Sequence, residues 1–152
     1  MTKILFICHG NICRSVMAQC VFQDLINRRH RADAYFVDSA ATSREELGSS
    51  IYPPAERMLV KKGVPVLAHV SRQITAKDYE KFDYLIGMDE ENRRSMLRIF
   101  ANDPEGKCFL LPQFAGTSRT IADPWYSGDF EAAYRDVLEG CTALFEKLEE
   151  EK

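Results

Sequence analysis

Four short apolar runs, separated by longer segments of helical periodicity, most strongly constrain how this chain can fold. The runs are rich in branched and aromatic residues and are short, so we interpret them as buried strands. Strands that alternate with helices assemble as βαβ units, in which the strands lie parallel in one sheet. The pattern therefore predicts an α/β fold whose strands cover residues 3–7, 35–38, 84–88 and 107–111.

The segments between these runs carry signals for the starts and ends of helices. An apolar stripe begins at Ser15 and runs to a polar cluster at residues 27–31. Pro53 is suited to open the next helix, and Gly63 has the residue type that ends one. The capping-box spacing of Thr75 and Asp78 predicts the start of a third helix. A fourth helix is predicted over residues 89–100, and a last one begins at Asp129. Residues 113–128 are predicted to form a loop.

The size and charge of the chain exclude several classes of function. With 152 residues, 45% of them hydrophobic, we expect residues 1–152 to form one domain. The net charge of −3 offers no basic field, so nucleic-acid binding is not expected. The apolar run at residues 4–7 is too short for a signal peptide or a membrane span. We therefore expect a cytoplasmic protein without membrane association, and a monomer as the default state.

The cysteines of the chain are odd in number and mostly scattered. Secreted proteins that depend on disulfides have even numbers of cysteines in framework spacings. The pattern therefore favours reduced thiols, one of which could be chemically active. The five residues are Cys8, Cys13, Cys20, Cys108 and Cys141.

The segment at residues 8–15 has the features of a phosphate-binding loop. It lies between a predicted strand and a predicted helix, so its backbone N–H groups and the helix N-terminus can converge on one anion. Gly10 and Asn11 tolerate the unusual dihedral angles of such a loop. The planar guanidinium of Arg14 can bind two phosphate oxygens at once. Together these residues predict a site for a tetrahedral dianion.

The same positive environment favours the thiolate form of Cys8 over the thiol. A thiolate is a strong nucleophile, so Cys8 is positioned to attack the phosphorus of a bound phosphate ester. Arg14 and the loop amides would then stabilise the equatorial oxygens of the transition state. The product of this step would be a thiophosphate intermediate on the enzyme.

Other interpretations of the segment are weaker. Cys8 could simply end a buried strand and Arg14 could be an exposed helix residue, but the intervening residues and the flanking elements all agree with catalysis. A Walker loop for ATP is absent from the sequence. Cys8, His9 and Cys13 offer at most three metal ligands, at a spacing unlike that of zinc motifs. Neither a metal nor another cofactor is therefore expected.

Two motifs in combination resemble those of the low-molecular-weight protein tyrosine phosphatase family. They are C-H-G-N-I-C-R-S at residues 8–15 and D-P-W-Y at residues 123–126, and stretches at residues 37–43, 69–74 and 82–89 also match. The resemblance implies a single-domain three-layer sandwich. Its central four-stranded parallel sheet has the order 2-1-3-4 and is flanked by helices on both faces, with the phosphate loop between the first strand and the first helix.

The resemblance also implies roles for individual residues. The nucleophile would be Cys8, Arg14 would bind phosphate, and Asp123 would be the general acid that protonates the phenolate and later activates water. Ser15 would stabilise the thiolate and assist its departure. The substrate would be phosphotyrosine in proteins, or a small aryl phosphate. The remaining residues of the phosphate-binding loop are His9, Gly10, Asn11, Ile12 and Cys13.

Further positions match residues that support the site in the family. The resemblance implies that Asn11, Ser39 after the second strand, and His69 form a hydrogen-bonded support that holds the loop in shape. Asp89, at the end of the third strand, matches an aspartate near the arginine of the active site. The aromatic residues expected to wall the substrate ring are Trp125 and Tyr126.

The family pattern suggests a redox role for Cys13, five positions after Cys8. A reversible disulfide between the two would protect the nucleophile from overoxidation. A buried structural thiol is the plainer alternative. The segment at residues 44–54 matches the family least well and lines the substrate entrance in its members.

Two other functions compete with a phosphatase. A thioredoxin-coupled arsenate reductase shares the loop but needs two further cysteines, and this chain has none between Cys20 and Cys108. A phosphotyrosine-binding module would keep the anion loop without turnover. The D-P-W-Y element at residues 123–126 also argues against the reductase, and the joint presence of Cys8, Arg14 and Asp123 argues against the binding module.

Overall fold

A central strand, β1 (Thr2–Cys8), organises the fold in the computed structural model, which describes residues 1–152. It pairs in parallel with β2 (Tyr35–Ala41) on one side and β3 (Tyr84–Gly87) on the other. β4 (Cys108–Leu110) adds to β3, so the strand order is β2-β1-β3-β4. The predicted parallel sheet and its order are confirmed.

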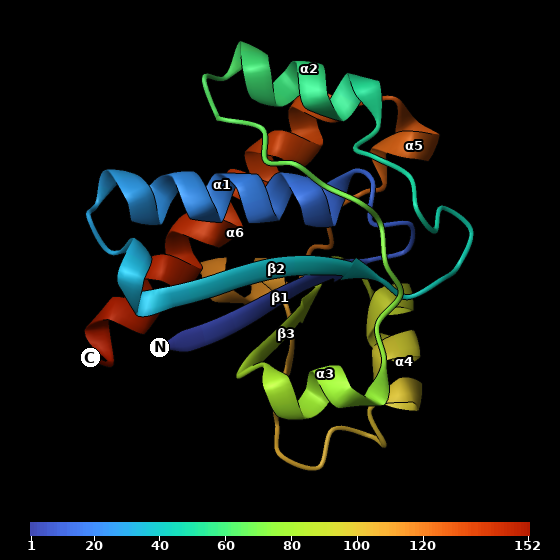
Figure 1. The fold of residues 1–152 in the computed structure, drawn as a ribbon, viewed down its shortest axis with the longest axis vertical. Helices are drawn as coiled ribbons and strands as arrows, with labels where there is room; N and C mark the ends of the chain where they lie inside the picture. Colours follow the sequence, from blue (N-terminus) through green and yellow to red (C-terminus); the bar gives the residue numbers. More distant parts are fainter.

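Helices cover both faces of the sheet (Figure 1). Three helices contribute to the layer over the larger core, and two helices cover the opposite face of the sheet. The first group comprises α1 (Arg14–Arg28), α2 (Pro53–Lys61) and α6 (Phe130–Glu150), and the second comprises α3 (Ala76–Lys81) and α4 (Glu90–Ile99). Three single-turn elements complete the chain, namely η1 (Ala32–Ala34), η2 (Leu111–Ala115) and α5 (Pro124–Ser127).

Alternate residues of β1 supply two separate cores. Ile4 and Phe6 belong to the larger cluster, under α1 and α6, whereas Leu5 and Ile7 belong to the smaller cluster, under α3 and α4. All four side chains are fully buried. Because successive side chains of a strand point to opposite faces, a strand covered on both sides must be apolar throughout. This requirement explains the uninterrupted apolar run in the sequence.

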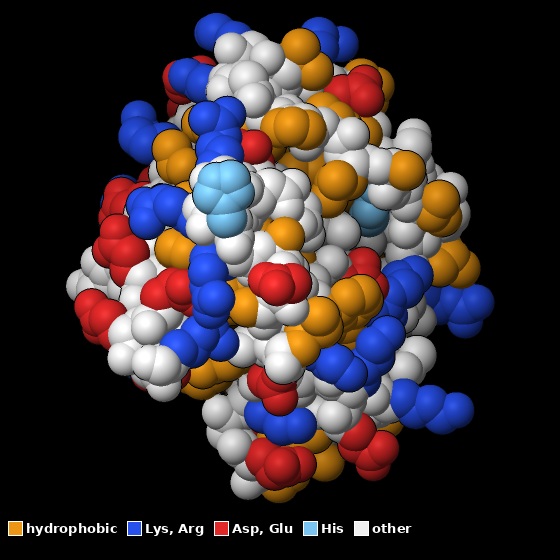
Figure 2. Space-filling view, turned by 60° about the vertical axis from the view of Figure 1, so that its left-hand side comes forward, with side chains coloured by type: hydrophobic (Ala, Val, Ile, Leu, Met, Phe, Trp, Pro, Cys, Tyr) orange, Lys and Arg blue, Asp and Glu red, His pale blue; other side chains and the backbone are white.

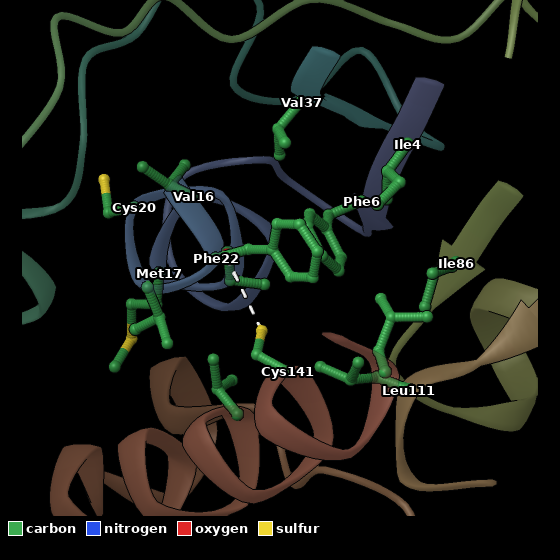
Figure 3. Packing of buried hydrophobic residues seen from close by; sticks show 14 of the residues in the cluster. Ile4, Phe6, Val16, Met17, Cys20, Phe22, Val37, Ile86, Leu111 and Cys141 are labelled. Carbon is green, nitrogen blue, oxygen red and sulfur yellow. Dashed lines mark hydrogen bonds between the residues drawn. The ribbon is translucent and has the colours of Figure 1, made fainter. Parts of the chain in front are cut away.

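The larger core is built around Phe22 of α1 (Figure 3). Its ring lies 6.0 Å from that of Phe6 and makes an edge contact at 5.5 Å with Tyr35. Cys141 of α6 approaches the carbonyl of Ala18 at 3.7 Å from its sulfur, so the two helices meet closely here. Burial raises the pKa of the Cys141 thiol, which therefore stays neutral and acts as a small apolar group.

Some element boundaries differ from those predicted. β2 extends to Ala41, three residues beyond the predicted end, because β1 pairs with it all the way to the Cys8–Ala41 register. β4 is one residue shorter at each end than predicted. The predicted loop at residues 113–128 contains α5 and the end of η2. The capping box is present, since Asp78 accepts a hydrogen bond from the Thr75 amide at 2.8 Å.

The carboxyl ends of the parallel strands meet at one edge of the sheet, which is the usual ligand edge of such folds (Figure 1). The loop from β1 to α1, the segment at residues 42–52, the start of α4 and α5 all gather there. On the face drawn in Figure 2, basic and acidic side chains are interspersed. No helix of the chain combines the length and apolar character that a membrane span requires.

Gly140 permits the close approach of α6 to η2. An ideal Cβ atom at this position would lie 2.5 Å from Cγ of the fully buried Leu111. We expect Gly140→Ala to lower the free energy of unfolding by about 1–2 kcal/mol, because overpacking outweighs the gain of roughly 1 kcal/mol from alanine in a helix. Urea denaturation measures this change. In a Leu111→Ala background the same substitution should be neutral or stabilising, and an equal cost in both backgrounds would contradict the proposed clash.

Candidate active site

The loop between β1 and α1 wraps around the sulfur of Cys8. The amide of Asn11 donates a hydrogen bond to Sγ at 3.3 Å, and the hydroxyl of Ser15 lies 3.0 Å from the same atom. All three residues are buried. α1 begins at Arg14, so the sulfur lies beside the N-terminus of a fifteen-residue helix. Amide and hydroxyl donors together with the helix dipole favour a negative charge on the sulfur.

Asn11 is the centre of this loop. Its φ is +56°, in the left-handed region that asparagine tolerates better than most residues, and its side chain is fully buried. The side-chain amide donates to the Ser15 hydroxyl at 2.7 Å. Because the Ser15 oxygen accepts that bond, its own proton is free to point toward the sulfur of Cys8. Asn11 therefore orients the serine as well as the backbone.

A second segment, at residues 69–72, supports the loop from outside. His69 Nε2 donates to the Asn11 carbonyl at 2.6 Å, and the Ser71 hydroxyl donates to the Gly10 carbonyl at 2.9 Å. The amide of Arg72 reaches Oδ1 of Asn11 at 3.4 Å. Burial lowers the pKa of His69, so the ring is neutral near neutral pH and carries its proton on Nε2.

The structure corrects the expectation for Ser39. This residue lies within β2 rather than after it, and its hydroxyl donates to Oε1 of Gln19 on α1 at 2.6 Å. Side chains alternate along a strand, so Ser39 lies on the same face of β2 as Val37, under α1, and its hydroxyl bonds Gln19 rather than the phosphate loop. Ser71 makes the hydroxyl contact to the loop instead, and no sequence signal had singled it out.

Arg14 is buried at the base of the site, with only 2% of its surface exposed. Nη1 donates to Oδ2 of Asp89 at 2.7 Å and to the Ile121 carbonyl at 2.8 Å. Nη2 lies 3.5 Å from Asp123, and Nε has no hydrogen-bond partner within the chain. Burial acts to lower the pKa of Arg14, but the neighbouring negative charges outweigh it and raise the pKa. The guanidinium is therefore charged, fixed in place and incompletely hydrogen-bonded, as an anion site requires.

Asp123 approaches this group from the far end of the chain. It precedes α5 as the N-cap residue, and Oδ1 accepts the amide of Trp125 at 3.1 Å. Pro124 occupies the first helical position, where its fixed φ suits a helix start. The side chain is 23% exposed. One carboxylate oxygen is thus held by the cap, while the other faces Arg14.

Cys13 is the N-cap residue of α1 and lines the same pocket as Cys8. Burial, and next the charge of Cys8, raise its pKa to about 12. Cys13 is therefore a neutral thiol near neutral pH. All five cysteines are free thiols in the structure.

Aromatic and acidic side chains form the mouth of the pocket. Trp125 and Tyr126 are 49% and 81% exposed, and the Trp125 ring packs 4.7 Å from that of Tyr52. Sequence reasoning did not single out Glu45 or Glu46, because they belong to the segment with the weakest motif match. The pocket is lined by Cys8, His9, Gly10, Ile12, Cys13, Arg14, Glu45, Glu46, Asp123, Trp125 and Tyr126.

The structure thus brings together residues that the sequence places far apart. Cys8, Arg14, Asp123 and both aromatic residues share one pocket, and Asp89 pairs with Arg14 beneath it. Nowhere does the chain gather three or more His, Cys, Asp or Glu side chains in a way that could hold a metal ion. The arrangement can bind a phosphate ester with a sulfur nucleophile, a cation and a carboxyl group around it.

The chain matches known proteins of one family over almost its whole length. Residues 3–152 match the family model of low molecular weight phosphotyrosine protein phosphatases. The human low molecular weight phosphotyrosine protein phosphatase is 37% identical over 150 residues, which cover 95% of this chain and 94% of the human protein. The Bacillus subtilis low molecular weight protein-tyrosine-phosphatase YfkJ is 31% identical over 154 residues, which cover 100% of this chain and 99% of YfkJ.

Solved structures agree with the sequence matches. The crystal structure of Bacillus subtilis YfkJ superposes with a TM-score of 0.96 at 30% identity, and covers 100% of this chain and 97% of YfkJ. A protein tyrosine phosphatase from Entamoeba histolytica superposes with a TM-score of 0.91 at 30% identity, over 99% of this chain and 98% of that chain. Because sequence and structure both match over nearly the full length, this chain belongs to the low molecular weight phosphotyrosine protein phosphatase family.

Proposed function

We propose that the protein hydrolyses phosphotyrosine in protein substrates through a cysteinyl-phosphate intermediate on Cys8. Membership of a family of protein tyrosine phosphatases makes the chain a hydrolase, and the individual steps are our proposal. One observation carries it. The sulfur of Cys8 receives two polar contacts inside a pocket whose base holds Arg14 and whose edge holds Asp123.

In the first step the phosphate dianion binds to the loop amides and to Arg14. Asp89 and the Ile121 carbonyl occupy Nη1, so Nε and Nη2 remain to bind phosphate oxygens. The thiolate of Cys8 attacks phosphorus, a P–S bond forms and the P–O bond to the phenol breaks. Asp123, in its acid form, donates a proton to the leaving phenolate oxygen.

In the second step water replaces the thiolate. The carboxylate of Asp123 removes a proton from a water molecule that attacks the phosphorus, the P–S bond breaks, and inorganic phosphate is released. Ser15 donates a hydrogen bond to the departing sulfur, which the contact at 3.0 Å supports. One aspartate therefore serves as acid in the first step and base in the second.

Trp125 and Tyr126 favour a planar aromatic ester over the shorter phosphoserine, because their rings line the pocket that contains Cys8.

A similar structure, with a TM-score of 0.88 and 30% identity, is a Drosophila arginine phosphatase, so phosphoarginine is a useful comparison substrate. The monomeric state, the cytoplasmic location and the reversible disulfide between Cys8 and Cys13 stay predictions.

The nucleophile is tested by substitution of Cys8. We expect the wild type to hydrolyse p-nitrophenyl phosphate and phosphotyrosine peptides in EDTA, with inhibition by vanadate. Cys8→Ser should lower kcat by at least about 10³-fold, because the serine hydroxyl does not ionise to an alkoxide near neutral pH.

Arg14→Lys should weaken phosphate binding, because lysine lacks the planar guanidinium that binds two oxygens at once. Hydrolysis by Cys8→Ser at the wild-type rate would contradict the mechanism, and binding without turnover by the wild type would indicate a phosphotyrosine-binding module.

The general acid is tested by the dependence on the leaving group. We expect Asp123→Ala to lower kcat/KM by about 10²–10⁴-fold for phosphotyrosine, whose phenolate needs a proton. The loss should be much smaller for p-nitrophenyl phosphate, whose leaving group is stable as an anion. Steady-state kinetics on a series of aryl phosphates measures the effect. A loss of equal size for all leaving groups would remove Asp123 as the acid.

His69 is tested through the pH dependence of stability. Because burial lowers its pKa in the folded state, the unfolded chain binds the proton more tightly, so stability is full above about pH 6.5 and is lost as the pH falls. His69→Gln should remove this loss, and should also lower kcat/KM through a less rigid loop. Urea denaturation at neutral and mildly acidic pH measures the difference.

The matched control for His69 is His30→Asn, at an exposed position with φ +57° that asparagine tolerates. This variant should keep the pH dependence of the wild type. If His69→Gln and the wild type lost stability equally on acidification, the buried neutral imidazole would not support the loop as described.

A further inference from the structure

Two glutamates at the mouth of the pocket have no part in the steps proposed above. Glu45 and Glu46 lie in the segment between β2 and α2, and both line the pocket that contains Cys8 and Arg14. Neither carboxylate lies within 4.0 Å of a Lys or Arg nitrogen, although Arg44 is next in sequence. Their negative charges therefore stand at the entrance of a site that must accept a dianion.

The phosphate loop holds the Glu45 carboxylate and the segment around it in position. Glu45 Oε2 lies 2.8 Å from Nε2 of His9, the residue after the nucleophile. The carbonyl of His9 accepts hydrogen bonds from the amide of Ser43 at 3.1 Å and from its hydroxyl at 2.9 Å. Nδ1 of His9 also lies 4.0 Å from Glu91 of α4. The segment is thus attached to the loop by side chain and backbone.

Glu46 lies directly over the loop. An ideal Cβ on Gly10 would be 3.4 Å from Cγ of Glu46, so its stem covers this glycine, and its carboxylate accepts the Ser49 hydroxyl at 3.1 Å. Burial is the main cause of the raised pKa of Cys13, and the charge of Glu46 contributes to it. The field of Glu46 therefore reaches the inner wall of the pocket.

A negative rim without Lys or Arg partners, next to a dianion site, repels a phosphate ester that has no positive charge of its own. The repulsion becomes attraction when the substrate has a cation beside the phosphorylated residue. Trp125 lines the same pocket, and its half-exposed ring offers a face on which a Lys or Arg side chain can lie. The mouth therefore has two kinds of group that attract cations, whereas Arg14 is buried at the base of the pocket, where it faces the phosphate.

We propose that Glu45, positioned by His9, and Glu46 select protein substrates in which Lys or Arg flanks the phosphotyrosine. This inference rests on the proposed phosphatase activity and names the class of substrate for it. Glu45 and Glu46 act on the flanking residues, whereas Cys8, Arg14 and Asp123 act on the phosphate. Specificity and chemistry are therefore separable by substitution.

The experiment compares three phosphotyrosine peptides that differ only in their flanking residues, which are lysine, alanine or glutamate. The wild type should show kcat/KM about tenfold higher for the lysine peptide than for the glutamate peptide at low salt. The preference should shrink at high salt because the charges are exposed and screened. In the double variant Glu45→Gln/Glu46→Gln the preference should fall to about twofold or less, while p-nitrophenyl phosphate is still hydrolysed.

The matched control is Glu105→Gln/Glu150→Gln, which changes the net charge equally at exposed positions away from the pocket. This control should keep the full preference of the wild type. Equal turnover of all three peptides by the wild type, or a preference that survives in Glu45→Gln/Glu46→Gln, would overturn the inference. Failure of every substrate, p-nitrophenyl phosphate included, would instead overturn the proposed phosphatase function.

Discussion

Asn11 holds a left-handed backbone conformation inside the protein, and the rest of the phosphate loop is arranged around it. Its side chain orients Ser15, its amide faces the sulfur of Cys8, and its carbonyl accepts His69. A buried polar residue is costly unless its groups are hydrogen-bonded, and here each of these groups has a partner. The network therefore fixes the loop in one shape before any substrate binds, which reduces the reorganisation that catalysis requires.

The second requirement of the site is a buried cation whose charge is only partly compensated. Arg14 is almost fully buried, which would be unfavourable without Asp89 and the Ile121 carbonyl on one side of its guanidinium. These partners satisfy Nη1 and leave Nε without a hydrogen bond from the chain. The fold thus compensates the buried charge of Arg14 in part and leaves N–H donors of its guanidinium for an anion. The carboxylate of Asp89 also caps α4, so the position of the Arg14 guanidinium is fixed relative to this helix.

The sequence predicted the architecture of the sheet well, and its errors have a common cause, which is the pairing and packing of distant segments. The strand runs, the Thr75 and Asp78 cap and the loop motif are local patterns, and the fold and the family that they indicated are confirmed. The predicted end of β2 was wrong because the length of this strand depends on its pairing with β1. Ser39 was expected at the loop but lies on the face of β2 that α1 covers, and Ser71 was missed because its contact with Gly10 joins segments 61 residues apart.

By itself, the sequence determined that the chain forms a parallel α/β sheet and that a cysteine and an arginine share a loop before a helix, because periodicity and short motifs are properties of neighbouring residues. The family resemblance pointed to Asp123 and Asp89, but only the tertiary structure decided how these groups meet that loop and that a glutamate pair joins them. Asp89, Asp123 and the glutamate pair at residues 45–46 reach it from three other segments. Their placement follows from strand order and packing, which bring the carboxyl ends of parallel strands to one edge however far apart they lie in the chain.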